Sequence, residues 1–135
     1  MNPAREKYYR GLFLAGTIYD IPLGIIFMFF FKYPFELLGI TEKIPKGAYI
    51  SLIGAFLFVI GIAYLLIYLG DLLKNRDLII VGALYKLAYC SIGIYYFAIG
   101  DYPHIIFIAL FGVIDLIFFV LMAECAIFIN KTSRA

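Results

Sequence analysis

The stretch AYISLIGAFLFVIGIAYLLIYL, residues 48–69, contains no charged side chain. An α-helix rises about 1.5 Å per residue, so roughly 20 apolar residues cross the hydrocarbon core of a bilayer, which is about 30 Å thick. This stretch therefore predicts a membrane-spanning helix, and it sets the length scale for the rest of the chain.

Three further apolar stretches have this length, at residues 12–31, 78–99 and 104–129. The whole chain is 65% hydrophobic and only 15% charged, whereas soluble domains are roughly 45–50% apolar. We therefore predict an all-α fold, a transmembrane four-helix bundle in which residues 1–135 form a single integral membrane domain. The short connections predict that the second and third spans, and the third and fourth, form antiparallel hairpins. The first stretch is too long for a signal peptide, so we expect it to remain in the mature protein.

The longest connection, KYPFELLGITEKIPKG at residues 32–47, contains the apolar segment YPFELLGI. That segment is too short to cross a bilayer and too apolar to be fully solvated, so we predict a short segment at the membrane interface. A passive plug over the end of the bundle and a functional lid are both compatible with the pattern.

Basic residues are distributed unequally between the two sides of the predicted membrane. Three stand on the side of the long connection: Lys32, Lys43 and Lys46. Seven stand on the other side: Arg5, Lys7, Arg10, Lys74, Arg76, Lys131 and Arg134. Lys and Arg are enriched in cytoplasmic segments, so both termini are predicted to be cytoplasmic. The formal net charge of +2 is too small to indicate nucleic-acid binding. The predicted partner is the lipid bilayer.

Four ionisable residues lie inside the predicted spans: Asp20, Lys86, Asp115 and Glu124. Each costs about 2.5–3.5 kcal/mol at the centre of a membrane helix unless it has a partner or a wet cavity. Asp20 and Lys86 lie at similar depth, which makes Lys86 the natural counter-ion. Asp115 and Glu124 project from opposite sides of the fourth span, and Glu124 is close enough to the interface to reach it. We therefore place the candidate site at Asp20, Lys86 and Asp115.

Helical spacing places further residues on the same faces as these charges. In the third span, Tyr89 and Tyr96 share the face of Lys86 and could contact a bound polar group. Pro22 lacks an N–H and is predicted to free the carbonyl of Ile18, which would make a polar notch beside Asp20. The predicted pocket lining consists of Gly16, Pro22, Gly24, Gly82, Gly93, Gly112, Phe119 and Met122.

Two interpretations of these charges remain open. The first is a buried ion pair that fixes the register of the helices. The second is a site that binds a small amphipathic molecule or an ion, as intramembrane ionisable groups usually indicate. We favour the second, because one ion pair would satisfy Lys86 and leave a second carboxyl group to be explained.

The sequence argues against several kinds of chemistry. His104 is the only histidine, so haem and multi-histidine metal sites are disfavoured. Cys90 and Cys125 lie in separate spans without metal-binding spacing. No nucleophilic triad, phosphate-binding loop or zinc-protease motif occurs, so catalysis by the isolated chain has little support. The identity of any cofactor is unknown.

Several short patterns resemble the small four-helix DoxX-like membrane proteins of bacteria. They are GTIYDIPLG in the first span, PFELLGI after it, IGAFLFVIGIAY in the second span and GALYKLAY in the third. The resemblance implies the bacterial cytoplasmic (inner) membrane and an association with a quinone-linked redox complex. It carries no catalytic residue to this chain.

Three functions therefore remain: a protein that binds a small amphipathic molecule or ion, a proton- or ion-coupled transporter, and a structural or quinone-associated subunit of a membrane redox complex. For the last two, a homo-oligomer or a larger assembly is the expected state.

Overall fold

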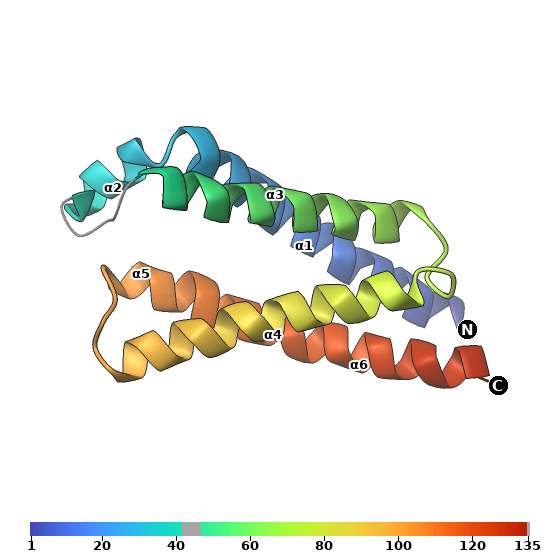
Figure 1. Ribbon diagram of the computed structural model, residues 1–135. Coiled ribbons are helices and arrows are strands. Elements are labelled where there is room, and N and C mark those ends of the chain that lie inside the picture. The colour runs from blue at the N-terminus through green and yellow to red at the C-terminus, as the bar shows by residue number, and fades with distance from the viewer. Residues whose placement is uncertain (42–46, 135) are drawn as a thin grey trace.

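The computed structural model describes residues 1–41 and 47–134, and these residues form helices joined by short loops (Figure 1). The long helices are α1 (Pro3–Phe29), α3 (Gly47–Leu69) and α4 (Arg76–Ala98). The fourth span is composed of α5 (Ile105–Phe107), the π-helical segment η2 (Ile108–Ile114) and α6 (Asp115–Arg134). All four spans are long and apolar enough to cross a membrane, which confirms the predicted all-α transmembrane bundle.

Helix α1 begins well before the predicted first span. Asn2 occupies the N-cap position and its side chain accepts a hydrogen bond from the backbone N–H of Ala4, at 2.8 Å. Pro3 follows at the first helical position, where a missing N–H costs nothing. The mostly polar residues before Leu12 are therefore helical and extend the membrane helix toward the N-terminus.

The long connection contains the short helix α2 (Lys32–Leu38), in agreement with the predicted short segment. Its Phe35 is 97% buried, with its ring 5.9 Å from both Phe27 of α1 and Phe107 of α5. Gly39 ends the helix with a φ of 70°, a conformation that favours glycine. Two of the basic residues counted for topology, Lys43 and Lys46, lie outside the described residues.

The helices pack as two pairs, α1 with α3 and α4 with α6 (Figure 1). The α4–α6 hairpin agrees with the prediction, whereas α3 packs mainly against α1 and only weakly against α4. Glycine explains the α1–α3 pairing. A Cβ atom on Gly24 would lie 2.6 Å from the backbone nitrogen of Phe58, and one on Gly54 would lie 2.5 Å from that of Met28. Neither helix can therefore carry a side chain at this crossing.

The two pairs converge at the end of the bundle that carries both termini and separate toward α2 and α5 (Figure 1). At the converged end, all four spans contribute to one buried core, represented by Phe13, Tyr64, Ile79 and Met122. At the other end, a second core forms around Phe27, Phe35 and Leu57.

Segment η2 is a stretch of π-helix that ends where α6 begins, at Asp115. A π-helix bonds each carbonyl to the N–H five residues on, and such segments are rare and often found at functional sites. The carbonyl oxygen of Leu110, within η2, accepts a hydrogen bond of 2.8 Å from the hydroxyl of Tyr19 on α1. The irregular segment is thereby bound to the helix that carries Asp20.

Candidate functional site

Three charged side chains from three helices meet inside the bundle. The Lys86 ammonium of α4 donates hydrogen bonds to Asp20 Oδ1 at 3.0 Å, Asp20 Oδ2 at 2.9 Å and Asp115 Oδ1 at 2.9 Å. All three residues are wholly buried. We refer to Asp20, Lys86 and Asp115 as the charged cluster. The structure thus brings together the three residues that the sequence analysis selected.

Three aromatic rings also lie close to the ammonium group. Lys86 Nζ lies 4.9 Å from the ring centre of Phe118, 5.0 Å from that of Tyr19 and 5.6 Å from that of Tyr64. A cation within about 6 Å of an aromatic face is attracted by the ring quadrupole, more strongly when water is absent. The rings therefore stabilise the buried charge of Lys86, while its N–H groups donate to the carboxyl groups of Asp20 and Asp115.

The small residues around Tyr64 make room for this arrangement. A Cβ atom on Gly82 would lie 2.7 Å from the Tyr64 ring, and one on Gly16 would lie 3.2 Å from it. The same Cβ atom on Gly16 would lie 3.1 Å from the methyl carbon of Met122. The Tyr64 hydroxyl donates a hydrogen bond of 2.8 Å to the carbonyl of Gly82. Gly16, Gly82 and Met122 therefore pack around the aromatic ring beside the cluster, and none of them lines a described cavity.

The cluster is electrostatically unbalanced when all its groups are ionised, because it holds two carboxylates and one ammonium. Asp20 presents both oxygens to Lys86, but Asp115 presents only Oδ1. Asp115 Oδ2 is buried and has no hydrogen-bond partner among the described residues. A buried polar atom without a partner costs free energy, so this atom is the point at which the cluster is incomplete.

An apolar cavity of about 410 Å³ begins about one helical turn from the cluster. It lies between the two helix pairs and is lined by Phe27, Phe35, Ile50, Ile53, Ala88, Tyr89, Ile92, Gly93, Phe107 and Phe111. Tyr89 follows Lys86 by three residues, and Phe111 precedes Asp115 by four. The rings of Tyr89 and Phe111 are 5.7 Å apart, and both line the cavity.

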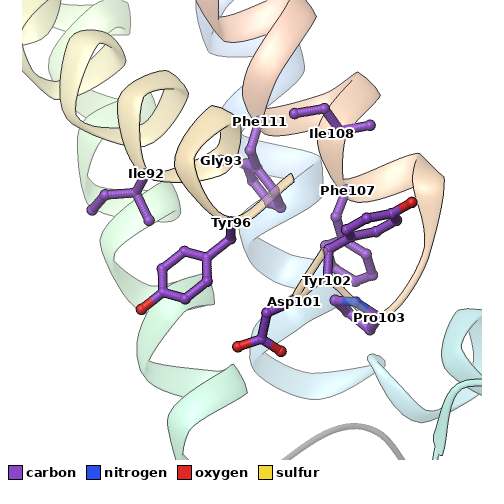
Figure 2. Close-up of a pocket in the computed structure, with 9 residues that line it drawn as sticks. All are labelled: Ile92, Gly93, Tyr96, Asp101, Tyr102, Pro103, Phe107, Ile108 and Phe111. Atoms are coloured by element: carbon purple, nitrogen blue, oxygen red, sulfur yellow. The ribbon is translucent and has the colours of Figure 1, made fainter. Parts of the chain in front are cut away.

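A second cavity, of about 200 Å³, lies beside the loop between α4 and α5 (Figure 2). It shares Ile92, Gly93, Phe107 and Phe111 with the apolar cavity, and its other lining residues include Tyr96, Asp101 and Tyr102. We call it the loop cavity. The predicted site residue Tyr96 lies here, about 15 Å along α4 from Lys86. It therefore belongs to the loop cavity and cannot contact the charged cluster.

Several predicted lining residues lie away from the charged cluster. Pro22 is exposed, because two residues along a helix rotate the side chain by about 200° from Asp20. Ile18, whose carbonyl Pro22 leaves without its usual partner, is 64% exposed. The predicted notch beside Asp20 therefore faces outward and is not part of the cluster.

The remaining four predicted lining residues each have a different position. Gly24 lies at the α1–α3 crossing, where its role is close packing. Phe119 lines a shallow surface groove together with Glu124 and Phe128. Gly112 is buried in η2, where a Cβ atom would approach the side chain of Ile108. Gly93 is the predicted glycine that does line a cavity.

Glu124 lies near the end of the bundle that carries the termini, apart from the cluster. Its carboxylate accepts hydrogen bonds from the Tyr9 hydroxyl at 2.8 Å and 2.9 Å and from Arg5 at 3.3 Å. This geometry agrees with the expectation that Glu124 reaches the interface while Asp115 faces the interior.

The three aromatic residues around Lys86, which are Tyr19, Tyr64 and Phe118, were not among the predicted site residues. Tyr19 is adjacent to Asp20, but adjacent helical residues point in different directions, so adjacency alone gave no reason to select it. The π-helical segment and the apolar cavity were also not predicted. Among the described residues, no group of three His, Cys, Asp or Glu side chains could hold a metal ion.

Comparisons with known proteins identify no relative: no family model, curated protein or solved structure matches this chain significantly.

Proposed function

We propose that this integral membrane protein binds a small amphipathic molecule in the apolar cavity, about one helical turn from the charged cluster. The observation that carries the proposal is the position of the cavity, whose lining includes Tyr89 and Phe111, about one turn along the chain from Lys86 and Asp115. Its volume of about 410 Å³ falls within the range of about 300–1,000 Å³ that is typical of ligand pockets.

The lining of the cavity indicates the chemistry of the ligand. Tyr89 is the one described lining residue with a polar side-chain group, and the others offer aliphatic or aromatic surface or only backbone. Such a site suits a molecule that is mostly apolar and carries one small polar group. Burial of apolar area contributes about 25 cal/mol per Å², so an acyl or isoprenoid chain would supply most of the affinity.

The cavity also has a route of entry. Its lining includes Ala88, which is exposed, and Ile92, which is 59% exposed. Because residues that line the cavity are exposed on α4, an apolar helix long enough to span a membrane, we infer that the cavity opens toward the lipid. A hydrophobic ligand would therefore enter from the bilayer without crossing the aqueous loops.

Saturable photolabelling tests the proposal. The protein in lipid nanodiscs is labelled with a diazirine-bearing palmitate, with and without excess unlabelled palmitate, and the labelled residues are mapped by mass spectrometry. We expect competable labelling around residues 88–93 and 107–111. Ala88→Leu, which fills the opening, should abolish it, whereas Ala98→Leu, an exposed alanine of the same helix that lines no described cavity, should leave it unchanged. Labelling that no competitor reduces would contradict the proposal.

Decylubiquinone as the competitor tests the DoxX-like resemblance in the same assay. If the protein is associated with a quinone-linked complex, decylubiquinone should displace the palmitate probe at lower concentration than palmitate does. Equal or weaker displacement would remove the quinone as the preferred ligand and leave the general amphiphile proposal intact.

A proton-coupled transporter is the second candidate, because the charged cluster contains one more carboxyl group than ammonium group. In proteoliposomes, a transporter of this kind would show flux that depends on a pH gradient and is lost in Asp20→Asn. Absence of flux under any gradient would remove this candidate.

A further inference from the structure

We propose that the charged cluster binds one proton in the folded protein and that Asp115 carries it. With every group ionised, the cluster would hold a net charge of −1 without access to water, since Asp20, Lys86 and Asp115 are all wholly buried. Burying an ion without a counter-ion costs several kcal/mol. Protonation of one carboxyl group makes the cluster neutral and removes that cost.

The hydrogen bonds distinguish the two carboxyl groups. Asp20 binds the Lys86 ammonium through both oxygens, as a carboxylate does, whereas Asp115 uses Oδ1 alone. Asp115 Oδ2 has no partner among the described residues, so an ionised Asp115 would bury an unsatisfied charge at that atom. A protonated Asp115 keeps its neutral Oδ1 as an acceptor for Lys86. The proton therefore belongs on Asp115.

Five other titratable side chains lie around the cluster: Tyr19 on α1, Tyr64 on α3, and Tyr85, Tyr89 and Cys90 on α4. None of them donates a described hydrogen bond to Asp115 Oδ2, and the Tyr85 hydroxyl is itself buried without a described partner. The hydroxyls of Tyr19 and Tyr64 donate to the backbone carbonyls of Leu110 and Gly82, so neither donates to Asp115. The Cys90 thiol donates to the carbonyl of Leu87. Lys86 is thus the one cation in contact with either carboxyl group in the described part of the chain.

A proton fits this site better than a metal cation does. Hard cations take about six or more oxygen ligands, whereas the cluster offers one unclaimed carboxylate oxygen beside an ammonium group. None of the described cavities is lined by the three cluster residues, so there is no described room for a cation with its waters. A proton needs neither a coordination shell nor a cavity.

Infrared spectroscopy tests the inference directly. A protonated carboxyl group has a C=O stretch that is distinct from the carboxylate bands and shifts in heavy water, and exposed carboxyl groups are ionised near neutral pH. We expect wild-type protein in nanodiscs to show this band near neutral pH. The band should change frequency in Asp115→Glu, keep its frequency in Asp20→Glu and vanish in Asp115→Asn. The measurement involves no ligand, so its result is independent of the photolabelling that tests the proposed function.

Two outcomes would overturn the inference. Absence of the band in the wild-type protein would show that both carboxyl groups are ionised. This measurement does not depend on the folding of any variant. A frequency shift in Asp20→Glu instead of Asp115→Glu would place the proton on the wrong residue.

Thermal unfolding gives a second readout. The folded state holds a proton that the unfolded chain releases near neutral pH, so wild-type stability should fall as pH rises. Asp115→Asn, which mimics the protonated acid, should lack this dependence relative to wild type, and equal dependence in both proteins would count against the inference. Stabilisation of the wild-type protein by added Na⁺ or K⁺, with no acid band, would identify a cation site instead.

Discussion

Lys86 is the residue on which the interior of the bundle depends, because its ammonium group contacts both buried carboxyl groups. Removing one partner of a buried ion pair costs about 3–5 kcal/mol. We expect Lys86→Met, which keeps the length of the side chain and removes the charge, to lower the free energy of unfolding by about that amount. Thermal or denaturant unfolding in one lipid or detergent system measures it.

Lys131→Met is the matched control, since Lys131 is exposed and forms no ion pair within the described residues. Its effect should stay within about 0.5 kcal/mol. Equal effects of the two substitutions would show that Lys86 is not paired as described.

At the residue scale, the sequence was sufficient to select the charged cluster but not its surroundings. Charges inside a membrane span are rare and expensive, so Asp20, Lys86 and Asp115 stood out. Tyr19, Tyr64 and Phe118 did not, because aromatic residues make up 19% of the chain and occur on every helix face. Pro22 is exposed because it lies about 200° around the helix from Asp20.

At the scale of the elements, the crossing of α1 and α3 depends on Gly24 and Gly54. A methyl group on Gly24 would lie 2.6 Å from the backbone of Phe58 and 2.8 Å from that of Gly54, so the helices must separate to accept it. We expect Gly24→Ala to destabilise the protein by about 1–3 kcal/mol, the usual cost of overpacking. Thermal unfolding measures the change.

Gly11→Ala provides the comparison for this substitution. Gly11 lies in the same helix, and a Cβ atom there would meet nothing within 4 Å. Because alanine favours helix by up to about 1 kcal/mol over glycine, this variant should be at least as stable as wild type. If Gly24→Ala were equally well tolerated, the close α1–α3 crossing would be wrong.

Hydropathy predicted the helical spans but not the π-helical segment or the pairing of helices. The residues of η2 are as apolar as those of an ordinary membrane helix, so composition does not separate the two conformations. The pairing of α1 with α3 comes from backbone contact at two glycines far apart in sequence, whereas connection length favoured pairing α3 with α4. Short loops alone were therefore an incomplete guide.

At the scale of the whole molecule, one end of the bundle gathers the termini and most of the basic residues. The N-terminus, the α3–α4 loop and the C-terminus lie together there (Figure 1). We expect this end to face the cytoplasm, by the enrichment of Lys and Arg in cytoplasmic segments. A fluorescent-protein fusion at the C-terminus should fluoresce in bacterial cells, and an alkaline phosphatase fusion should be inactive. The reverse pattern would contradict the orientation.

The central claim is that Lys86 balances buried carboxyl groups inside the bundle, and a double-mutant cycle tests it most directly. Unfolding midpoints are compared for wild type, Lys86→Met, Asp20→Asn and the double variant Lys86→Met/Asp20→Asn in the same nanodiscs. Lys86→Met alone leaves the Asp20 carboxylate buried without its counter-ion. The double variant also removes that carboxylate, so it should be more stable than Lys86→Met alone. If the two losses simply add, so that the double variant is less stable than either single variant, Lys86 and Asp20 do not interact and the claim is wrong.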